Sequence, residues 1–272
     1  MPDLTGLVHY ENKTEIAGGH AHIIKGKYID PDGLAVHVAV KIIMVVDPFT
    51  GRVVSVDLPK YIKRGRRERK VWQRPKHENI IPLLGITTDY SSPLAPPNPV
   101  AMISPWMERG DLFKALNGNM AYSDRMHLAN VLINDEGNAC LTDFGLSFIS
   151  PEFLDTSYWS RSVGGAIRWR APELVPPISS VLDLEEYVPD LTSKCDIYSF
   201  GSLLLHAISG EWPYHTSQDH MVIIYLHHRT LPPRPQTLTD AQWELIVWCW
   251  GKGGHAVTRP TAEEVLVAIS AL

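Results

Sequence analysis

Two β-branched runs separated by a turn constrain the first part of this chain most strongly. Strand-like composition extends from Ile16 to Val46, with HIIKGKYI at residues 22–29 and LAVHVAVKIIMVV at residues 34–46. Between these runs lies DPDG, residues 30–33. This combination is typical of a turn, because Asp binds nearby backbone groups and Gly adopts a positive φ. The pattern predicts an antiparallel hairpin.

The composition changes after this hairpin. Residues 59–74, PKYIKRGRRERKVWQR, begin with a proline suited to the first helical turn and continue with good helix formers. Residues 79–90 and 99–107 return to strand-like patterns, and helical signals dominate the remainder. We therefore predict a single α+β domain with a small β-rich N-lobe, residues 1–106, and a mostly helical C-lobe, residues 107–272. The joint would lie near Ser104–Leu112.

Composition limits the function classes. The chain has 272 residues, 44% of them hydrophobic, and a formal net charge of -5. This charge argues against a general nucleic-acid binder, and the basic run Lys63–Lys70 is typical either of a solvated helix face or of a phosphate or partner patch. There is no signal-peptide pattern and no apolar stretch of about 18 residues, so we expect a cytoplasmic or nuclear protein without a membrane partner. Cys140, Cys195 and Cys249 have no CxxC spacing and predict neither a disulfide framework nor a zinc site.

Two charged residues of the first hundred could work together. Lys41 ends the strand-like segment VAVK, where a lysine either extends along the lobe edge or points at phosphate oxygens. Glu68 is the only acid between Asp57 and Glu78, in a segment rich in Lys and Arg. A lone acid among cations indicates either a dedicated carboxylate partner for Lys41 or an exposed helical charge pair.

A second pair follows further along the chain. Asn130 precedes the apolar VLI, and Asp143 opens the tripeptide DFG after INDEGNAC, a turn signal between two short strands. A hairpin of this size returns the chain, so an amide oxygen and a carboxylate can converge on one cation. Oxygen ligands together with nucleotide phosphates are what Mg²⁺ prefers.

Seven segments in order then suggest a family: VAVK, MISPWMERGDL, ANVLI, DFGLS, GGAIRWRAPEL, KCDIYSFGSLLLHAISGEWPY and RPTAEEVL. Together they span about Glu15 to Leu272, and the chain resembles the eukaryotic protein kinase family, in particular its tyrosine-kinase-like branch. The resemblance implies ATP and Mg²⁺ as cofactors and transfer of the γ-phosphoryl group to Ser, Thr or Tyr hydroxyls. The partners would be ATP and a protein substrate or protein partner.

The resemblance also implies roles for individual residues. Lys41 would hold the α/β-phosphates, Glu68 would pair with it, and Asn130 and Asp143 would bind Mg²⁺. Lys41, Glu68 and Asp143 are thus the predicted catalytic residues. Ser104 would be the gatekeeper, and Pro105 and Met107 would be hinge residues. The full set of predicted nucleotide-binding residues is Gly18, Gly19, Ile23, Ala39, Lys41, Ser104, Pro105, Met107 and Leu132.

Two further residue matches are architectural. Glu173 of APE corresponds to an acid that pairs with an arginine near the C-terminal end of the family domain, here Arg259. Asp196 corresponds to an acid that ties its helix to the catalytic loop.

The chain departs from the family pattern at the glycine-rich loop and at the catalytic base. Of the three loop glycines only the middle one is kept, as Gly18, with Gly19 beside it. The family places an Asp five positions before the Asn, but position 125 is arginine. Asp124 projects differently from its neighbour, and the spacing of His127 matches nothing in the motif. The sequence therefore predicts weakened nucleotide binding and impaired phosphotransfer.

The connection before Asn130 is also too short. The family places a long apolar helix between GDLFKAL and ANVLI, but only 14 steps separate Leu116 from Asn130. Fourteen residues reach at most about 46–50 Å when extended, and a 20-residue helix is itself about 30 Å long. The segment can bridge a gap but cannot also build that helix. We therefore predict a C-lobe that lacks one core helix, which leaves the helix around IYSFGSLLLHAI without a packing neighbour.

Three hypotheses fit these departures. The chain is a protein kinase with impaired activity, a pseudokinase acting as a nucleotide- or protein-binding module, or a truncated product of an intact kinase through splicing or gene prediction. Intact motifs on both sides of DRMHLAN fit a clean excision.

Overall fold

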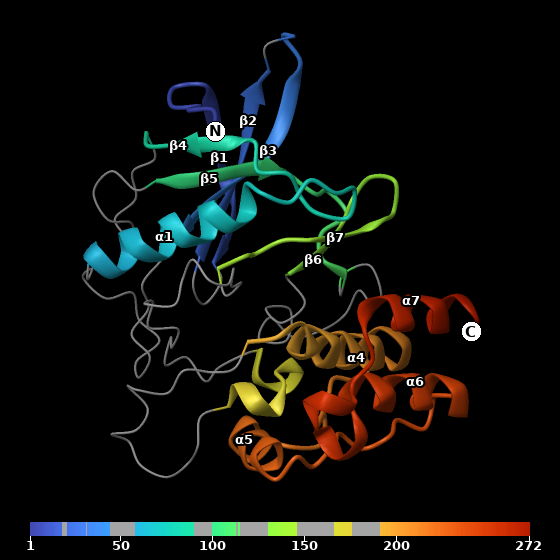
Figure 1. Cartoon of the computed structure of the whole chain (residues 1–272). Coiled ribbons are helices and arrows are strands. Elements are labelled where there is room, and N and C mark those ends of the chain that lie inside the picture. Colours follow the sequence, from blue (N-terminus) through green and yellow to red (C-terminus); the bar gives the residue numbers. More distant parts are fainter. Residues whose placement is uncertain are drawn as a thin grey trace. The chain divides into compact units, whose positions relative to one another are not determined.

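The computed structural model describes residues 1–17, 21–30, 32–43, 58–89, 100–112, 114, 130–145, 166–175 and 191–272. The chain forms two compact units, residues 1–154 and 155–272 (Figure 1). Within the described ranges, no helix is long and apolar enough to cross a membrane.

The first unit is built on a five-stranded antiparallel sheet. Its strand order is β1-β2-β3-β5-β4. The strands are β1 (Val8–Ala17), β2 (Ala21–Ile29), β3 (Ala35–Ile43), β4 (Gly85–Thr87) and β5 (Ala101–Pro105). The predicted hairpin is confirmed as β2 and β3, which pair from Ala21↔Ile43 to Ile29↔Ala35.

The hydrogen bonds and backbone angles of the turn between β2 and β3 explain why its sequence predicts a turn. The Asp30 carboxylate accepts the N–H groups of Asp32 at 3.0 Å and Leu34 at 2.8 Å, and the Asp30 N–H donates to the Leu34 carbonyl. Gly33 takes a φ of +81°, a conformation that side chains disfavour. Strand β1 begins at Val8, earlier than the predicted start of strand structure at Ile16. Its backbone pairing with β2 decides this boundary, since a polar segment such as ENKTE lacks a strand pattern of its own.

The two faces of this sheet have different surroundings. Val38, Val40 and Ile103 face a cluster with Leu4 and Val8 from the N-terminal segment. Leu4 also donates its N–H to the Ile86 carbonyl at 2.8 Å, so the N-terminal segment covers the β4 edge. The opposite face carries Lys41 and Met102, which are cross-strand neighbours.

Helix α1 (Leu58–Trp72) confirms the predicted helix and lies beside β3. Its last residue, Trp72, is buried and donates its indole N–H to the Ile81 carbonyl at 2.7 Å. Trp72, Ile81 and Met102 form a cluster with Cys140, and Phe144 packs against it.

Strands β6 (Val131–Ile133) and β7 (Ala139–Leu141) form the second predicted hairpin. Backbone bonds from Ile81 N–H to the Leu141 carbonyl (3.0 Å) and from Leu141 N–H to the Asn79 carbonyl (2.8 Å) join β7 to the segment after α1. The hairpin therefore belongs to the unit of residues 1–154, and the predicted lobe boundary after residue 106 stays a prediction.

The second unit is helical. It contains the helices α4 (Ser193–Ser209), α5 (Asp219–His227), α6 (Asp240–Trp250) and α7 (Ala262–Ser270), with the 3₁₀ turns η1 (Ala166–Trp169), η2 (Pro172–Leu174), η3 (Lys252–Gly254) and η4 (Ala256–Thr258). Helices α6 and α7 both start with capping boxes, at Thr239 and Thr261. The core gathers around α4, where the buried Trp250 donates its indole N–H to Ser202 at 3.0 Å.

Exposure varies along α4. Ile208 is 41% exposed and Leu203 is half-buried, whereas Phe200 packs against the cluster of Leu245, Cys249 and Val265. The segment in which the family helix would lie, residues 117–129, is outside the described residues, so the missing helix itself stays a prediction.

A buried ion pair joins the start of this unit to its end. The Arg259 side chain is fully buried and donates to both carboxylate oxygens of Glu173, with 2.8 Å for Nη2–Oε2. Its remaining donors reach the carbonyls of Lys194 (2.8 Å), Trp250 (3.0 Å) and Gly254 (3.1 Å). Burial by itself raises the pKa of Glu173, but the bonds from Arg259 outweigh it and hold this pKa below its usual value. The predicted pairing of Glu173 with Arg259 is therefore present.

Replacement of Arg259 by methionine should lower the free energy of unfolding of this unit by about 3–5 kcal/mol, because a half-buried carboxylate and three carbonyls lose their donor. The matched control is Arg234→Met, which breaks an ion pair to Asp240 whose side chain is 85% exposed. That change should cost about 1 kcal/mol or less. Urea unfolding at pH 7 measures both, and equal losses would contradict this role for Arg259.

Candidate functional site

Three charged side chains of the first unit meet at one point. The Lys41 ammonium lies 2.6 Å from Glu68 Oε1 and 2.9 Å from Asp143 Oδ1. Strand β3 supplies the lysine, α1 supplies Glu68, and Asp143 follows β7. Residues from three distant parts of the sequence are thereby brought together, as the sequence predicted for Lys41 and Glu68.

The burial of these groups differs sharply. The side chains of Lys41 and Glu68 are 8% and 2% exposed, whereas Asp143 is 44% exposed. Burial by itself lowers the pKa of Lys41, but the charges of Asp143 and Glu68 outweigh it, so this pKa is raised. The ammonium therefore stays charged at neutral pH. Glu68 holds it from the buried side, and Asp143 presents its carboxylate toward solvent.

The backbone around Asp143 is shaped for this contact. Asp143 has a φ of 62°, which is rare for residues other than glycine. Its carboxylate accepts the Gly145 N–H at 3.2 Å. A Cβ at position 145 would lie 2.9 Å from Glu68 Oε2, so a side chain there would press on the ion pair. The glycine of DFG is therefore required by the close approach of Glu68.

The hairpin also returns Asn130 to this region. The Thr142 N–H donates to the Asn130 carbonyl at 2.9 Å, so Asn130 lies opposite the residue that precedes Asp143. The side chain of Asn130 is exposed. Asn130 and Asp143 therefore occupy neighbouring backbone positions at the end of the β6–β7 hairpin.

The segment after β5 offers backbone groups for a ligand. Trp106 N–H donates to the His37 carbonyl at 2.9 Å, which fixes the register at the end of β5. In this register Pro105 is a non-bonded partner of Val38, so its missing N–H leaves no gap in the ladder. The Met107 N–H has no hydrogen-bond partner in the part of the chain that the structure describes. Ser104, the predicted gatekeeper, is buried at the end of β5.

The register of the sheet places several predicted residues on one face. Ile23 pairs with Lys41, and Ala39 pairs with both Lys25 and Ser104. Directly opposite residues share a face of the sheet. Leu132 lies in β6 and is half-buried beside the cluster of Trp72 and Met102. Ile23, Ala39 and Ser104 therefore lie on the same face of the sheet as Lys41, and Leu132 lies in the β6–β7 hairpin.

One pair beside this face was not predicted from the sequence. Lys25 forms an ion pair with Glu108 and lies 5.3 Å from the centroid of the Trp106 ring. His37 Nδ1 also lies 3.1 Å from the same carboxylate. The sequence feature that could have placed Lys25 here is its two-residue spacing from Ile23. This spacing puts both residues on the face of Ala39 and Lys41.

Other predicted features lie outside the described residues. They are Gly18 and Gly19 of the glycine-rich loop, and Asp124, Arg125 and His127 of the catalytic loop. The expected catalytic-loop partners of Asp196 lie in the same undescribed part of the chain.

Comparison with known proteins decides the family. The sequence profile of the family described as protein tyrosine and serine/threonine kinase matches residues 124–269, more than half of the chain. The chain belongs to this protein kinase family. The α+β kinase fold predicted from the sequence is thereby confirmed. The described residues show an antiparallel sheet and helix α1 in the first unit and helices in the second.

Individual relatives support the same assignment. Over 149 residues the kinase domain is 34% identical to the serine/threonine-protein kinase mos of Patiria pectinifera, covering 52% of this chain and 38% of that protein. It is 30% identical over 245 residues to Ephrin type-B receptor 4 of Homo sapiens, covering 77% and 22%. With Ephrin type-B receptor 1 of Gallus gallus the identity is 26% over 284 residues, covering 92% and 25%. The chain thus spans less than half the length of each of these relatives.

The buried ion pair yields a stability prediction. Lys41→Met should lower the free energy of unfolding by about 3–5 kcal/mol at pH 7, because it leaves the Glu68 carboxylate buried without its cation. The double change Lys41→Met with Glu68→Leu should recover most of this loss, because no buried charge then remains.

Lys25→Met is the matched control for that experiment. Its partner Glu108 is 53% exposed and can be solvated, so the loss should be about 1 kcal/mol or less. Urea unfolding of the three variants measures the difference. If the double variant is less stable than Lys41→Met alone, the loss does not come from an unpaired buried carboxylate, and this explanation is contradicted.

Proposed function

We propose that this kinase domain binds ATP with Mg²⁺ and transfers the γ-phosphoryl group to Ser, Thr or Tyr hydroxyls of proteins, at a rate lowered by the missing catalytic aspartate. The observation that carries the proposal is the Lys41 ammonium held between Glu68 and the solvent-facing carboxylate of Asp143. An ammonium braced by a buried carboxylate is suited to phosphate oxygens. Family membership supports the same reaction class.

The donor groups fit a magnesium nucleotide. Asp143 and Asn130 supply carboxylate and amide oxygens, the ligands that Mg²⁺ accepts beside phosphate oxygens. The cation would neutralise phosphate charge when bound. Lys41 would exchange its contact with Asp143 for the α/β-phosphates while Glu68 holds it from behind. The carbonyl of Pro105 and the N–H of Met107 would bind the base edge, and Ile23, Ala39 and Leu132 would enclose the base.

A second candidate function is a pseudokinase that binds nucleotide or protein without phosphotransfer. Arg125, at the position of the family's catalytic Asp, favours it. The short connection before Asn130 is compatible with both functions and also with a truncated product. The alignment with Ephrin type-B receptor 1 extends over 284 residues, although this chain has only 272. The receptor therefore has residues for which this chain has no counterpart. An intracellular location remains part of the proposal.

Nucleotide binding is tested by thermal unfolding with ATP, with and without Mg²⁺. Saturating ATP–Mg²⁺ should raise the melting temperature, because a ligand at about 100 times its Kd stabilises the folded state by about 2.7 kcal/mol. Asp143→Asn should remove the dependence on Mg²⁺, whereas the control Asp32→Asn, in the exposed turn after β2, should retain it. Absence of any shift at millimolar ATP–Mg²⁺ would exclude this site as a nucleotide site.

Catalysis is tested by restoring the acid. Arg125→Asp should raise phosphotransfer from ATP to a generic protein substrate by up to about 10²–10⁴, the usual contribution of a positioned general base. Arg66→Asp, an equal charge change on the exposed part of α1, should leave the rate unchanged. If neither the wild type nor Arg125→Asp transfers phosphate while ATP still binds, the pseudokinase function replaces the proposed one.

A further inference from the structure

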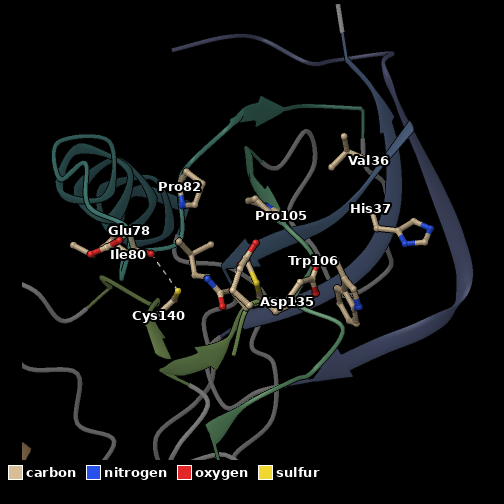
Figure 2. A pocket seen from close by; sticks show the side chains of 13 residues that line it. Val36, His37, Glu78, Ile80, Pro82, Pro105, Trp106, Asp135 and Cys140 are labelled. Carbon is tan, nitrogen blue, oxygen red and sulfur yellow. Dashed lines mark hydrogen bonds between the residues drawn. The ribbon is translucent and has the colours of Figure 1, made fainter. Parts of the chain in front are cut away.

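The first unit contains a pocket of about 310 Å³ beside the segment that follows β5 (Figure 2). Four stretches of chain line it: the start of β3, the loop after α1, residues 105–107, and the β6–β7 turn with the start of β7. Of the proposed nucleotide-binding residues only Pro105 and Met107 take part, while Ile23, Lys41 and Leu132 do not. The pocket therefore lies apart from the proposed phosphate site and borders the proposed base site, with which it shares Pro105 and Met107.

The walls of this pocket are held in place by hydrogen bonds. Cys140 Sγ donates to the Glu78 carbonyl at 3.4 Å, a contact drawn in Figure 2. The Asn138 N–H donates to the Asn134 side-chain oxygen at 2.7 Å and shapes the β6–β7 turn. The Ile133 N–H donates to the Gly110 carbonyl at 2.9 Å and ties this hairpin to the segment after β5. A ligand would find the walls already ordered, which lowers the entropic cost of binding.

The lining combines an apolar interior with an acidic rim. The apolar part comes mainly from Ile80, Ile81, Pro82 and Met107. Three exposed carboxylates border it, on the residues Glu78, Asp135 and Glu136. None of these three has an ion pair within the described residues.

Few cationic side chains of the described residues lie near these three carboxylates. The lining residues include no Lys or Arg, and the imidazole of His37 is directed to the Glu108 carboxylate. The Arg109 guanidinium lies against the β6–β7 turn, where it donates to the backbone carbonyl of Asp135 at 3.5 Å. Lys76 lies near Glu78 in sequence and is exposed. The local charge of the lining is thus negative, as is the formal net charge of -5 for the whole chain.

We propose that this pocket binds a basic–apolar segment of a partner protein. An apolar side chain of the partner would enter between Ile80, Pro82 and Met107, and a neighbouring Lys or Arg would meet the carboxylates of Asp135 and Glu136. A volume of about 310 Å³ is at the lower end for small-molecule pockets, about 300–1,000 Å³, and suits one or two anchoring side chains. The acidic rim disfavours phosphorylated or acidic segments, because like charges would meet.

A peptide array tests the chemistry of this partner. The probes are hexapeptides that combine Arg or Lys at two positions with Leu, Ile or Met at two others, in all orders. Each has two counterparts, one with Glu in place of the basic residues and one with Ser in place of the apolar residues. The full chain should bind a subset of the first set at least ten-fold more strongly than either counterpart. Equal binding to all three sets, or to none, would overturn the proposal.

The best peptide, carrying fluorescein, then locates the site by fluorescence anisotropy. Asp135→Asn with Glu136→Gln should weaken binding at least ten-fold, and binding by the wild type should weaken with added NaCl, because exposed charges are screened. The control Asp32→Asn with Glu244→Gln changes the net charge equally at exposed positions outside the pocket and should bind as the wild type does. Equal loss in both double variants would assign the binding to overall charge and overturn the site.

Two further measurements separate this site from other possibilities. Hydrogen exchange with the peptide should slow at residues 78–82 and 134–137, and slowing elsewhere alone would also overturn the site. If sedimentation shows that the free protein dimerises and that the Asp135 and Glu136 variant is monomeric, the occupant is a second copy, and the peptide proposal fails. Since none of these readouts uses nucleotide, they stand apart from the test of ATP binding.

Discussion

A lysine that is buried and charged must have carboxylates around it, and this requirement organises the first unit. Lys41 is enclosed at the end of β3, where an unpaired ammonium would cost several kcal/mol. Glu68 must therefore reach it from α1, and the turn after β7 must bring Asp143 to its open side. One electrostatic demand thus fixes a strand, a helix and a hairpin relative to one another. The same arrangement leaves the Asp143 carboxylate facing solvent, where a cation can bind it and a phosphate group can replace it on the Lys41 ammonium.

The second unit also contains a buried cation that is paired with a carboxylate. Arg259 is fully buried and its fork of donors is shared between the Glu173 carboxylate and three backbone carbonyls. Because an arginine presents several fixed donors, it can form hydrogen bonds to several chain segments at once and hold them together. The difference between the two ion pairs is instructive. Arg259 is enclosed by groups that cannot be exchanged, whereas Lys41 keeps one partner, Asp143, that is nearly half exposed. The first arrangement suits architecture, and the second suits ligand exchange.

Sequence reasoning succeeded where the signal was local. The Asp30–Gly33 turn, the helix that follows Leu58 and the β6–β7 hairpin each carry their own pattern of turn residues or apolar spacing. It failed where the structure comes from a neighbour. Strand β1 exists because β2 offers it a pairing edge, and the contact of Lys25 with Glu108 joins residues that are distant in sequence. The pocket bounded by Glu78 and Asp135 follows the same logic, since its walls come from four stretches of chain that no local pattern connects.

The order of the motifs was enough to determine the kinase family, the α+β class and the identity of the charged residues that meet in the first unit. Types and spacing of residues determine these because turns, helix starts and strand alternation depend on local backbone preferences. Only the tertiary structure decided that Lys41 is shared by two carboxylates of unequal exposure, that Gly145 must lack a side chain beside Glu68, and that an acidic pocket lies beside Met107. Burial and distance between remote segments decide these features, and both are properties of the packed chain rather than of any stretch of it.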